Sequence, residues 1–373
     1  MSTGAVHKII AGCLFIVMLV IYLMTVAPTL SFWDCGEFIT CSYIMGIPHP
    51  PGSPLLSLIG RVFSLIPFYD FRGVGFGEIA YRVNMIDVLL GALTVMLTYF
   101  IMVRLIHRFR PPTGNRFEEA VVMFSAAITA LLIGFSDEFW NNAVETETYM
   151  PSIFMSMLAV WLTLRWEERS DDPRAVRYLF LAAYLLGLGN GVHLVVLLIA
   201  PTVFLMVLFA RPSWFSEPKL WLSAGLFMFV AALIKLFAGL GILYISMALF
   251  ALVAPYVLYR FYRGGQELWK TVLIAMLTCG SLYILGFWVY PTVMVRAYKD
   301  PAINEGDPDT WERYKLYMSR DQYGQENMYI GMFTRNAGFK YQFGFMYLRY
   351  LIQQFPKWGP TISFYFENNR SPD

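Results

Sequence analysis

Two acidic side chains stand three residues apart in the segment Ser31–Phe38, directly after a long apolar stretch: Asp34 and Glu37. If the chain is helical here, this spacing places both carboxylates on one face. Two carboxylates that close repel each other, so the pKa of one should rise, which suits a general base or a cation site. Alternatively, the two acids only cap the start of a helix, because acidic side chains favour the first turn. The spacing alone leaves both interpretations open.

A histidine follows in the turn Gly46–Pro54 (GIPHPPGSP). Its proline and glycine residues force a sharp corner in the chain. The flanking segments, Asp34–Gly46 and Pro54–Ile66, are predicted to be short amphipathic helices that cannot cross a bilayer. A single histidine in a loop is usually incidental. Because His49 lies between a carboxylate pair and a rigid turn, we predict that it binds substrate.

A second acidic cluster lies in the segment Asn141–Tyr149 (NNAVETETY). Carboxylate oxygens at Glu145 and Glu147 suit a hard divalent cation such as Mg²⁺ or Mn²⁺, which is therefore a candidate cofactor. The same oxygens can accept hydrogen bonds from sugar hydroxyls, so both acids and Tyr149 are predicted substrate-binding residues. The alternative is a solvated acidic start of a helix.

Four further polar residues lie at or inside apolar segments: Arg82, Asn84, Asn190 and His193. Polar groups are costly in hydrocarbon and are functional candidates for that reason. We predict that all four bind substrate, with Arg82 holding a lipid phosphate. For Arg82 the alternative is that its side chain only reaches towards the membrane surface.

The amino-acid composition indicates which kind of structural element positions these residues. Of the 373 residues, 57% are hydrophobic and 14% are charged, against about 25% charged in soluble domains. This excludes a soluble enzyme, and a net charge of +2 gives no sign of a nucleic-acid partner. Seven segments have the length and apolarity of a membrane span: Ile9–Leu30, Asn84–Val103, Glu119–Ser136, Met150–Arg165, Lys219–Phe237, Leu240–Tyr259 and Trp269–Pro291.

The apolar run Tyr178–Ala210 is too long for one span and contains the breaker cluster Gly187–Gly191. We predict two helices there, which makes about nine spans. Arginine-rich segments at 104–116 and 165–177 are then cytoplasmic by the positive-inside rule. The N-terminus is cytoplasmic as well, and two outer loops, 31–82 and 136–148, face outward from a transmembrane domain spanning 1–291.

The predicted outer tail, residues 292–373, contains the segment Phe339–Phe355, which mixes aromatic residues with Lys340 and Arg349. It is typical of a helix on the membrane surface. A small packed helix in a soluble cap is an equally good interpretation.

Taken in order, these stretches resemble the GT-C superfamily of membrane glycosyltransferases. More narrowly, APTLSFWDCGEF followed by HPPGSPLLSLIGR is similar to a bacterial branch related to transmembrane protein O-mannosyltransferases. Further matching stretches are YRVN, ETETY, GLGNGVHL and PAINEGDPDT…SRDQYG. The resemblance covers most of the chain. The first pair of motifs is fairly specific, and the others are weaker singly but occur in the right order.

The resemblance implies an all-α polytopic membrane protein with a GT-C-like fold. It implies transfer of a sugar, with mannose expected, from a polyprenyl-phosphate-linked donor to Ser or Thr hydroxyls of an exported protein. Asp34 matches the catalytic base best, with Glu37 second, and an inverting displacement is the simplest mechanism. The implied location is the bacterial inner membrane, among membrane lipids, with the active site facing the periplasm. Relatives in this branch often continue further, which would place part of acceptor recognition beyond these residues.

Two other functions fit an apolar chain of this kind. One is a transporter of a lipid-linked sugar or another small solute, and the other is a non-catalytic scaffold. Transporters tend to carry internal repeats and to place ionisable residues near the middle of the membrane. Here the acids cluster in the predicted outer loops and no repeat is visible, so the transferase is the favoured interpretation.

Overall fold

The computed structural model describes residues 3–67, 78–226, 229, 267–320, 338 and 340–354, and the fold is given for these residues. This part of the chain is mostly helical and contains no β-strand, only an isolated bridge between Ile47 and Asn304. The all-α prediction is therefore confirmed for the described residues.

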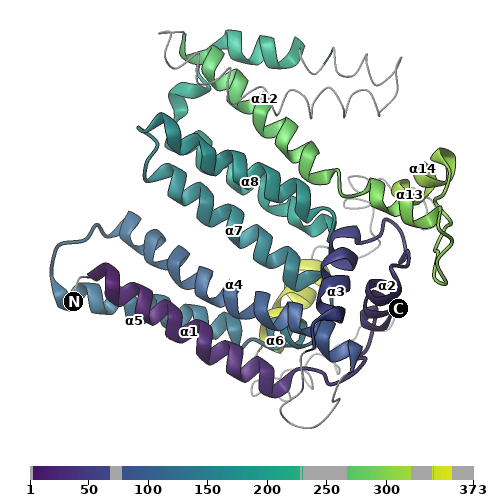
Figure 1. Ribbon diagram of the computed structural model, residues 1–373. Coiled ribbons are helices and arrows are strands. Elements are labelled where there is room, and N and C mark those ends of the chain that lie inside the picture. The colour runs from purple at the N-terminus through teal and green to yellow at the C-terminus, as the bar shows by residue number, and fades with distance from the viewer. Residues whose placement is uncertain are drawn as a thin grey trace.

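The long helices lie side by side in a bundle (Figure 1). They are α1 (Thr3–Thr25), α4 (Ile79–Phe109), α5 (Arg116–Gly134), α7 (Tyr149–Glu167), α8 (Val176–Gly189) and α12 (Leu268–Phe287). The shorter helix α9 (Ala200–Ala210) packs against α7. Four stretches among the described residues are long and apolar enough to cross a membrane: α1, α4, α5 and Leu268–Ala297. Most of the predicted spans 219–237 and 240–259 falls outside the described residues, so the total of nine spans stays a prediction.

The first helix ends earlier than predicted, at Thr25 rather than Leu30. Pro28 explains the difference, because proline disfavours helical backbone at the residue before it and lacks the N–H that would continue the helix. Helix α4 instead extends beyond the predicted span at both ends and has 31 residues.

The predicted break in Tyr178–Ala210 is confirmed. Helix α8 ends at Gly189, and the chain continues through a turn and a 3₁₀ segment, η2 (Leu194–Ile199), into α9. Gly187, however, lies within α8, where its backbone contacts α12. A Cβ added there would overlap the carbonyl oxygen of Tyr283.

Short elements gather at one end of the bundle (Figure 1). They are α2 (Cys35–Ile44), α3 (Pro54–Leu65), α6 (Asp137–Val144), α13 (Pro291–Ala297) and α14 (Trp311–Ser319). Helices α2 and α3 match the two short helices predicted from sequence. Helix α6 was not predicted. It occupies most of the predicted second outer loop and contains acids in its first turn.

The main core fills the space between α1, α4, α5 and α6. It is built around Met18, Tyr22, Val88, Val95 and Ala130, all almost fully buried. The hydroxyl of Tyr22 donates to the carbonyl of Gly134 at 2.8 Å, which satisfies a polar group inside this core.

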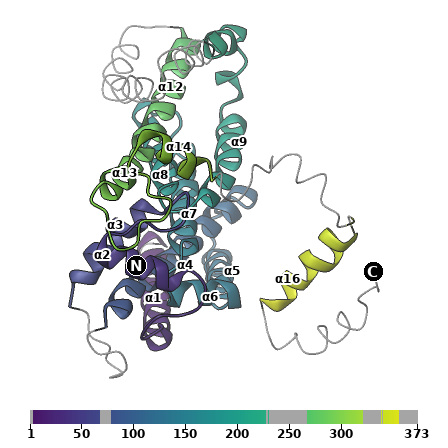
Figure 2. The ribbon, with the colours of Figure 1, turned by 90° about the vertical axis from the view of Figure 1, so that its right-hand side faces the viewer.

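The C-terminal segment of the described chain is helical, first as a π-helix (Lys340–Met346) and then as α16 (Tyr347–Gln353). Figure 2 shows α16 beside the bundle. Its end contacts α6, where the backbone N–H of Asp137 donates to the carbonyl of Gln354 at 3.1 Å. The helical prediction for this segment is thus confirmed.

Candidate active site

A pocket lies between the start of α2, the proline-rich turn, the start of α7, the turn that follows α8 and the end of α14. It encloses about 500 Å³, including its opening. Its walls come from five separate parts of the chain, with Asp34, Phe38, His49, Pro50, Pro51, Gly52, Ser53, Glu147, Thr148, Tyr149, Val192, His193, Leu194 and Arg320 as lining residues.

Asp34 stands at the N-cap position of α2, but its side chain makes no capping hydrogen bond. The residue is exposed and lines the pocket. Trp33 turns the chain into α2 with a φ of 58°, a left-handed conformation that is uncommon for a bulky side chain. The capping interpretation predicted a bond from the Asp34 carboxylate to the start of the helix, and the structure shows none.

Glu37 is bound to His49 through both carboxylate oxygens. Its Oε1 accepts the backbone N–H of His49 at 2.7 Å, and its Oε2 lies 2.7 Å from the imidazole Nδ1. This pair fastens the proline-rich turn onto α2. The ring of Phe38 packs against the imidazole with 5.7 Å between centroids.

From sequence we expected repulsion between Asp34 and Glu37 to raise the pKa of one of the two acids. For Glu37 the shift has the opposite direction. Burial alone would raise the pKa of Glu37, but the hydrogen bonds and positive charge of His49 outweigh it and hold that pKa below its usual value. The bond to Glu37 in turn raises the pKa of His49 against the opposing effect of burial. The pair therefore favours a charged imidazolium and carboxylate.

Glu147 is the carboxyl group of the pocket whose pKa is raised. The residue is only 7% exposed. Burial, together with the negative charges of Asp34 and Glu145, raises its pKa to about 7 in spite of backbone hydrogen bonds. A carboxyl group with this pKa can hold or release a proton near neutral pH.

Tyr149 and His193 contribute two aromatic rings to the lining, with 5.4 Å between their centroids. The Nδ1 atom of His193 accepts the backbone N–H of Val195 at 3.1 Å and so caps η2. In the neutral imidazole this bond leaves the proton on Nε2, which can donate to a ligand.

The structure thus brings six sequence-predicted residues to one place. Five line the pocket, and Glu37 stands behind His49. They come from the first outer loop, the second outer loop and the break after α8, as the prediction requires.

Four predicted substrate-binding residues do not line the pocket. Arg82 donates from Nη1 to the carbonyl of Ser64 at 3.1 Å, which ties α4 to the end of α3. Asn190 donates to the hydroxyl of Tyr283 at 2.5 Å, and its carbonyl accepts from Tyr290 at 2.7 Å. Glu145 is the C-cap of α6.

Asn84, the fourth, joins the two outer loops. Its amide nitrogen donates to the carbonyls of Ala27 at 2.9 Å and Thr29 at 3.3 Å. Its amide oxygen accepts from the backbone and hydroxyl of Thr146, at 3.0 and 2.6 Å. Asn84 is fully buried, so its role here is to position Asp34 and Glu147 relative to each other.

Arg320 lines the pocket and was not predicted as a site residue. It follows α14, at a φ of 56°. The loop before α14 is held against the proline-rich turn, which brings Arg320 to the pocket: Ile47 donates to the carbonyl of Ile303 at 2.8 Å and accepts from Glu305 at 3.1 Å. The only sequence signal for Arg320 was its place in the matching stretch SRDQYG.

Some of these carboxylates could be ligands of the predicted divalent cation. Asp34, Glu37 and His49 each offer a ligand atom, and these atoms lie within 4.8 Å of one another. Of the acids named from sequence as metal candidates, Glu147 lines the pocket and Glu145 does not. The first-loop residues are therefore the closest set of possible ligands among the described residues.

Comparison with known proteins finds similarity in the part of the chain that contains the pocket. Residues 34–216 match the family described as Protein O-mannosyl-transferase TMEM260 N-terminal domain. This stretch resembles the N-terminal part of a protein O-mannosyl-transferase. It begins at Asp34 and includes His49, Glu147 and His193, so nearly every residue that lines the pocket lies within it.

Two individual relatives agree with the family match. The chain is 26% identical over 237 residues to the mouse Protein O-mannosyl-transferase TMEM260, and 25% identical over 203 residues to the Dictyostelium discoideum protein of that name. These alignments cover 61% and 51% of this chain, but only 30% and 22% of the relatives. No solved structure matches the chain.

Proposed function

We propose that the protein is a membrane glycosyltransferase that moves a sugar, mannose by preference, from a polyprenyl-phosphate donor to Ser or Thr hydroxyls of an exported protein. The similarity to proteins named protein O-mannosyl-transferases supports the reaction class. The observation that carries the proposal is the Asp34 carboxylate, which lines a pocket at the end of an apolar bundle and caps no helix.

In this proposal Asp34 is the general base. Its carboxylate accepts the proton of the acceptor hydroxyl as the hydroxyl oxygen bonds to the anomeric carbon. The bond from that carbon to the phosphate oxygen breaks on the opposite side, so the configuration inverts. A well-placed general base contributes about 10²–10⁴-fold. Glu147, with a pKa of about 7, is suited to accept hydrogen bonds from sugar hydroxyls when ionised.

The leaving phosphate needs positive charge and hydrogen-bond donors. Arg320 supplies a guanidinium at the pocket, and His193 supplies the Nε2 proton. We assign the phosphate to these two residues rather than to Arg82, whose guanidinium is bonded to the carbonyl of Ser64. Glu37 positions His49, which carries a further positive charge at the rim.

The proposed location is a bacterial inner membrane, with the N-terminus in the cytoplasm and the pocket facing the periplasm. A lipid-linked donor keeps its phosphate at headgroup depth. Residues that directly follow α1, and those between α8 and η2, stand at that depth if these helices cross the membrane.

The test compares two acid-to-amide variants of the full chain. Asp34→Asn removes the proposed base, whereas Glu138→Gln removes an exposed acid on α6 that does not line the pocket. Each is expressed in cells that lack the native gene, and exported proteins are examined by mass spectrometry for hexose on Ser or Thr. Asp34→Asn should lose at least about 10²-fold in transfer, and Glu138→Gln should match the parent.

Thermal unfolding in detergent checks that Asp34→Asn is folded. Normal hexose transfer by that folded variant would remove Asp34 as the base. Absence of any hexose difference with the parent chain present, together with solute flux in liposomes, would instead support a transporter.

A further inference from the structure

A second pocket lies at the far end of the bundle, away from Asp34. It is formed by the start of α1, the end of α4, the loop before α5 with the start of that helix, and Glu168 directly after α7, and it encloses about 1140 Å³ including its opening. Three residues with permanent positive charge line it, one from each helix: Lys8, Arg104 and Arg116. Two histidines, His7 and His107, line it as well.

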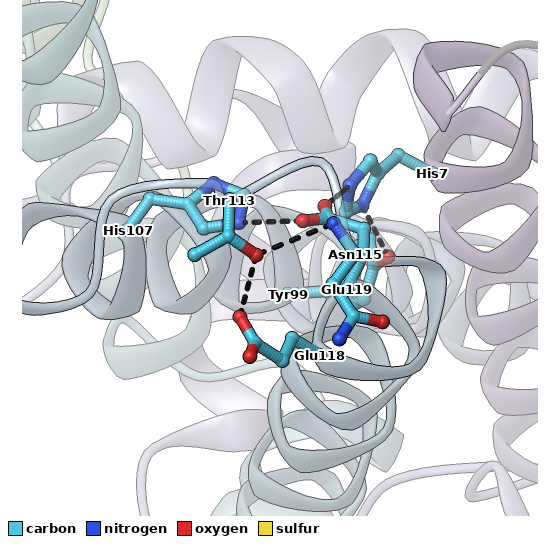
Figure 3. A network of polar contacts seen from close by, with 7 residues as sticks. All are labelled: His7, Tyr99, His107, Thr113, Asn115, Glu118 and Glu119. Atoms are coloured by element: carbon cyan, nitrogen blue, oxygen red, sulfur yellow. Dashed lines mark hydrogen bonds and ion pairs between the residues drawn. The ribbon is translucent and has the colours of Figure 1, made fainter.

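One of the two acids in this pocket is held by the histidines (Figure 3). Glu119 places Oε1 at 2.9 Å from Nε2 of His7 and Oε2 at 3.2 Å from Nε2 of His107. His7 is fixed in turn by the hydroxyl of Tyr99, at 2.7 Å from its Nδ1. Both oxygens of Glu119 therefore have partners within the protein.

The other acid, Glu168, is held by arginines. Its Oε1 accepts from Arg104 at 2.7 Å and its Oε2 accepts from Arg165 at 2.8 Å. Nearby Glu118 does not line the pocket, and it accepts from Thr113 at 2.6 Å in the loop before α5. The acids in and around the pocket are thus occupied by partners from the protein itself.

Two cations are left without an acidic partner. Within the described residues, neither Lys8 nor Arg116 forms an ion pair, and both are exposed. They project from different helices onto one cavity, so their positive charges add at that place. A doubly or singly charged phosphate group matches this arrangement, because it accepts hydrogen bonds from an ammonium and from a guanidinium fork together.

We propose that this pocket binds a phosphate-bearing anion, with Lys8 and Arg116 as its principal ligands. Its place favours the headgroup of an anionic phospholipid. The three helices that form it, α1, α4 and α5, are each apolar enough to cross a membrane, and the pocket lies at their ends, where headgroups lie. Free phosphate has the same chemistry and is the second source to be tested. The proposal does not depend on the proposed transferase activity.

The experiment uses the full chain in a neutral detergent. Binding is measured by native mass spectrometry and by the shift of the thermal unfolding midpoint, with three probes: phosphatidylglycerol, phosphatidylcholine and inorganic phosphate. The parent should bind phosphatidylglycerol at least tenfold more tightly than phosphatidylcholine. The double variant Lys8→Gln/Arg116→Gln should weaken phosphatidylglycerol binding at least tenfold.

A matched control removes the same charge elsewhere. Lys219 and Arg174 are exposed and do not line the pocket, so Lys219→Gln/Arg174→Gln should change binding less than twofold. The charge-preserving exchange Lys8→Arg/Arg116→Lys should keep most of the binding. If the glutamine pair does not fold, the single variants replace it.

Either source of phosphate supports the site. Binding of phosphatidylglycerol alone identifies a lipid headgroup, and equal binding of inorganic phosphate identifies a free anion. Equal weakening by the pocket and control pairs would show a general charge effect and overturn the proposal. Absence of saturable binding for both anionic probes would overturn it as well.

Discussion

Two carboxyl groups at the pocket, the half-buried Glu37 and the buried Glu147, have opposite electrostatic environments. Glu37 is bonded twice to His49, and its pKa is lowered. Glu147 has only backbone donors and neighbouring negative charges against its burial, and its pKa rises to about 7. Environments that separate the pKa values of neighbouring acids are typical of acid–base sites. The two groups thus serve different purposes: Glu37 keeps a charge for structure, and Glu147 can exchange a proton.

The raised pKa of Glu147 predicts a dependence of stability on pH. Folding favours the protonated form, so this contribution is complete below the unfolded pKa of about 4.5 and is lost as pH rises through about 7. The variant Glu147→Gln has no such proton. We expect the free energy of unfolding of the parent, relative to that of the variant, to fall by about 1–3 kcal/mol between pH 5 and pH 8.

Thermal unfolding of both proteins in detergent, at pH steps from 5 to 8, measures this difference. The pKa of His49 is raised by its bond to Glu37, but His49 is present in both proteins and its effect largely cancels. Parallel stability curves for the two proteins would mean that Glu147 ionises in the folded chain at the ordinary carboxyl pKa.

At the scale of helices, the pocket depends on how closely α8 packs on α12. Gly187 on α8 and Gly286 on α12 have no room for a Cβ, because each would meet backbone atoms of the opposite helix. Small residues permit this approach between membrane helices. The contact brings Tyr290 within reach of the carbonyl of Asn190, at 2.7 Å, and so fixes the break that presents His193.

Two glycines on α12 give a matched comparison. An added methyl group at Gly286 would overlap the carbonyl of Tyr184, whereas one at Gly280 would meet nothing within 4 Å. Gly286→Ala should therefore destabilise the protein by about 1–3 kcal/mol. Gly280→Ala should stabilise it by up to about 1 kcal/mol, because alanine is the better helix former. Unfolding midpoints in detergent measure both, and equal midpoints would argue against the close contact.

Gly187 shows which property of a residue could be predicted from sequence and which could not. The cluster Gly187–Gly191 was interpreted as a helix breaker, and the helix does end there, at Gly189. The packing function of Gly187 was invisible, because it depends on a partner helix far along the chain. Helix α6 was missed for a different reason: at eight residues it is shorter than the window of about 11–18 residues in which a helical period is recognised.

For the whole molecule, the sequence predicted most residues that line the pocket, but it did not predict the arginine to which the leaving phosphate is assigned in our proposal. Asp34, His49, Glu147 and His193 follow directly from their places after or between apolar helices. Arg320 reaches the pocket only because Ile47 pairs with residues 303 and 305, a long-range contact that no local pattern predicts. Arg82, the arginine predicted from sequence to hold the phosphate, is instead bonded to the carbonyl of Ser64 at the end of α3.

Orientation is the property of the whole molecule on which the proposed reaction depends, since exported acceptors meet the enzyme only outside the cytoplasm. Thr29 is exposed just before the pocket, and Ser213 is exposed in the segment that follows α9, at the other end of the bundle. In intact cells a membrane-impermeant maleimide should label Thr29→Cys, and it should label Ser213→Cys only after permeabilisation. The parent, with its four cysteines, gives the background. The reverse pattern would place Asp34 in the cytoplasm, where an exported acceptor and a donor sugar on the outer leaflet are both out of reach.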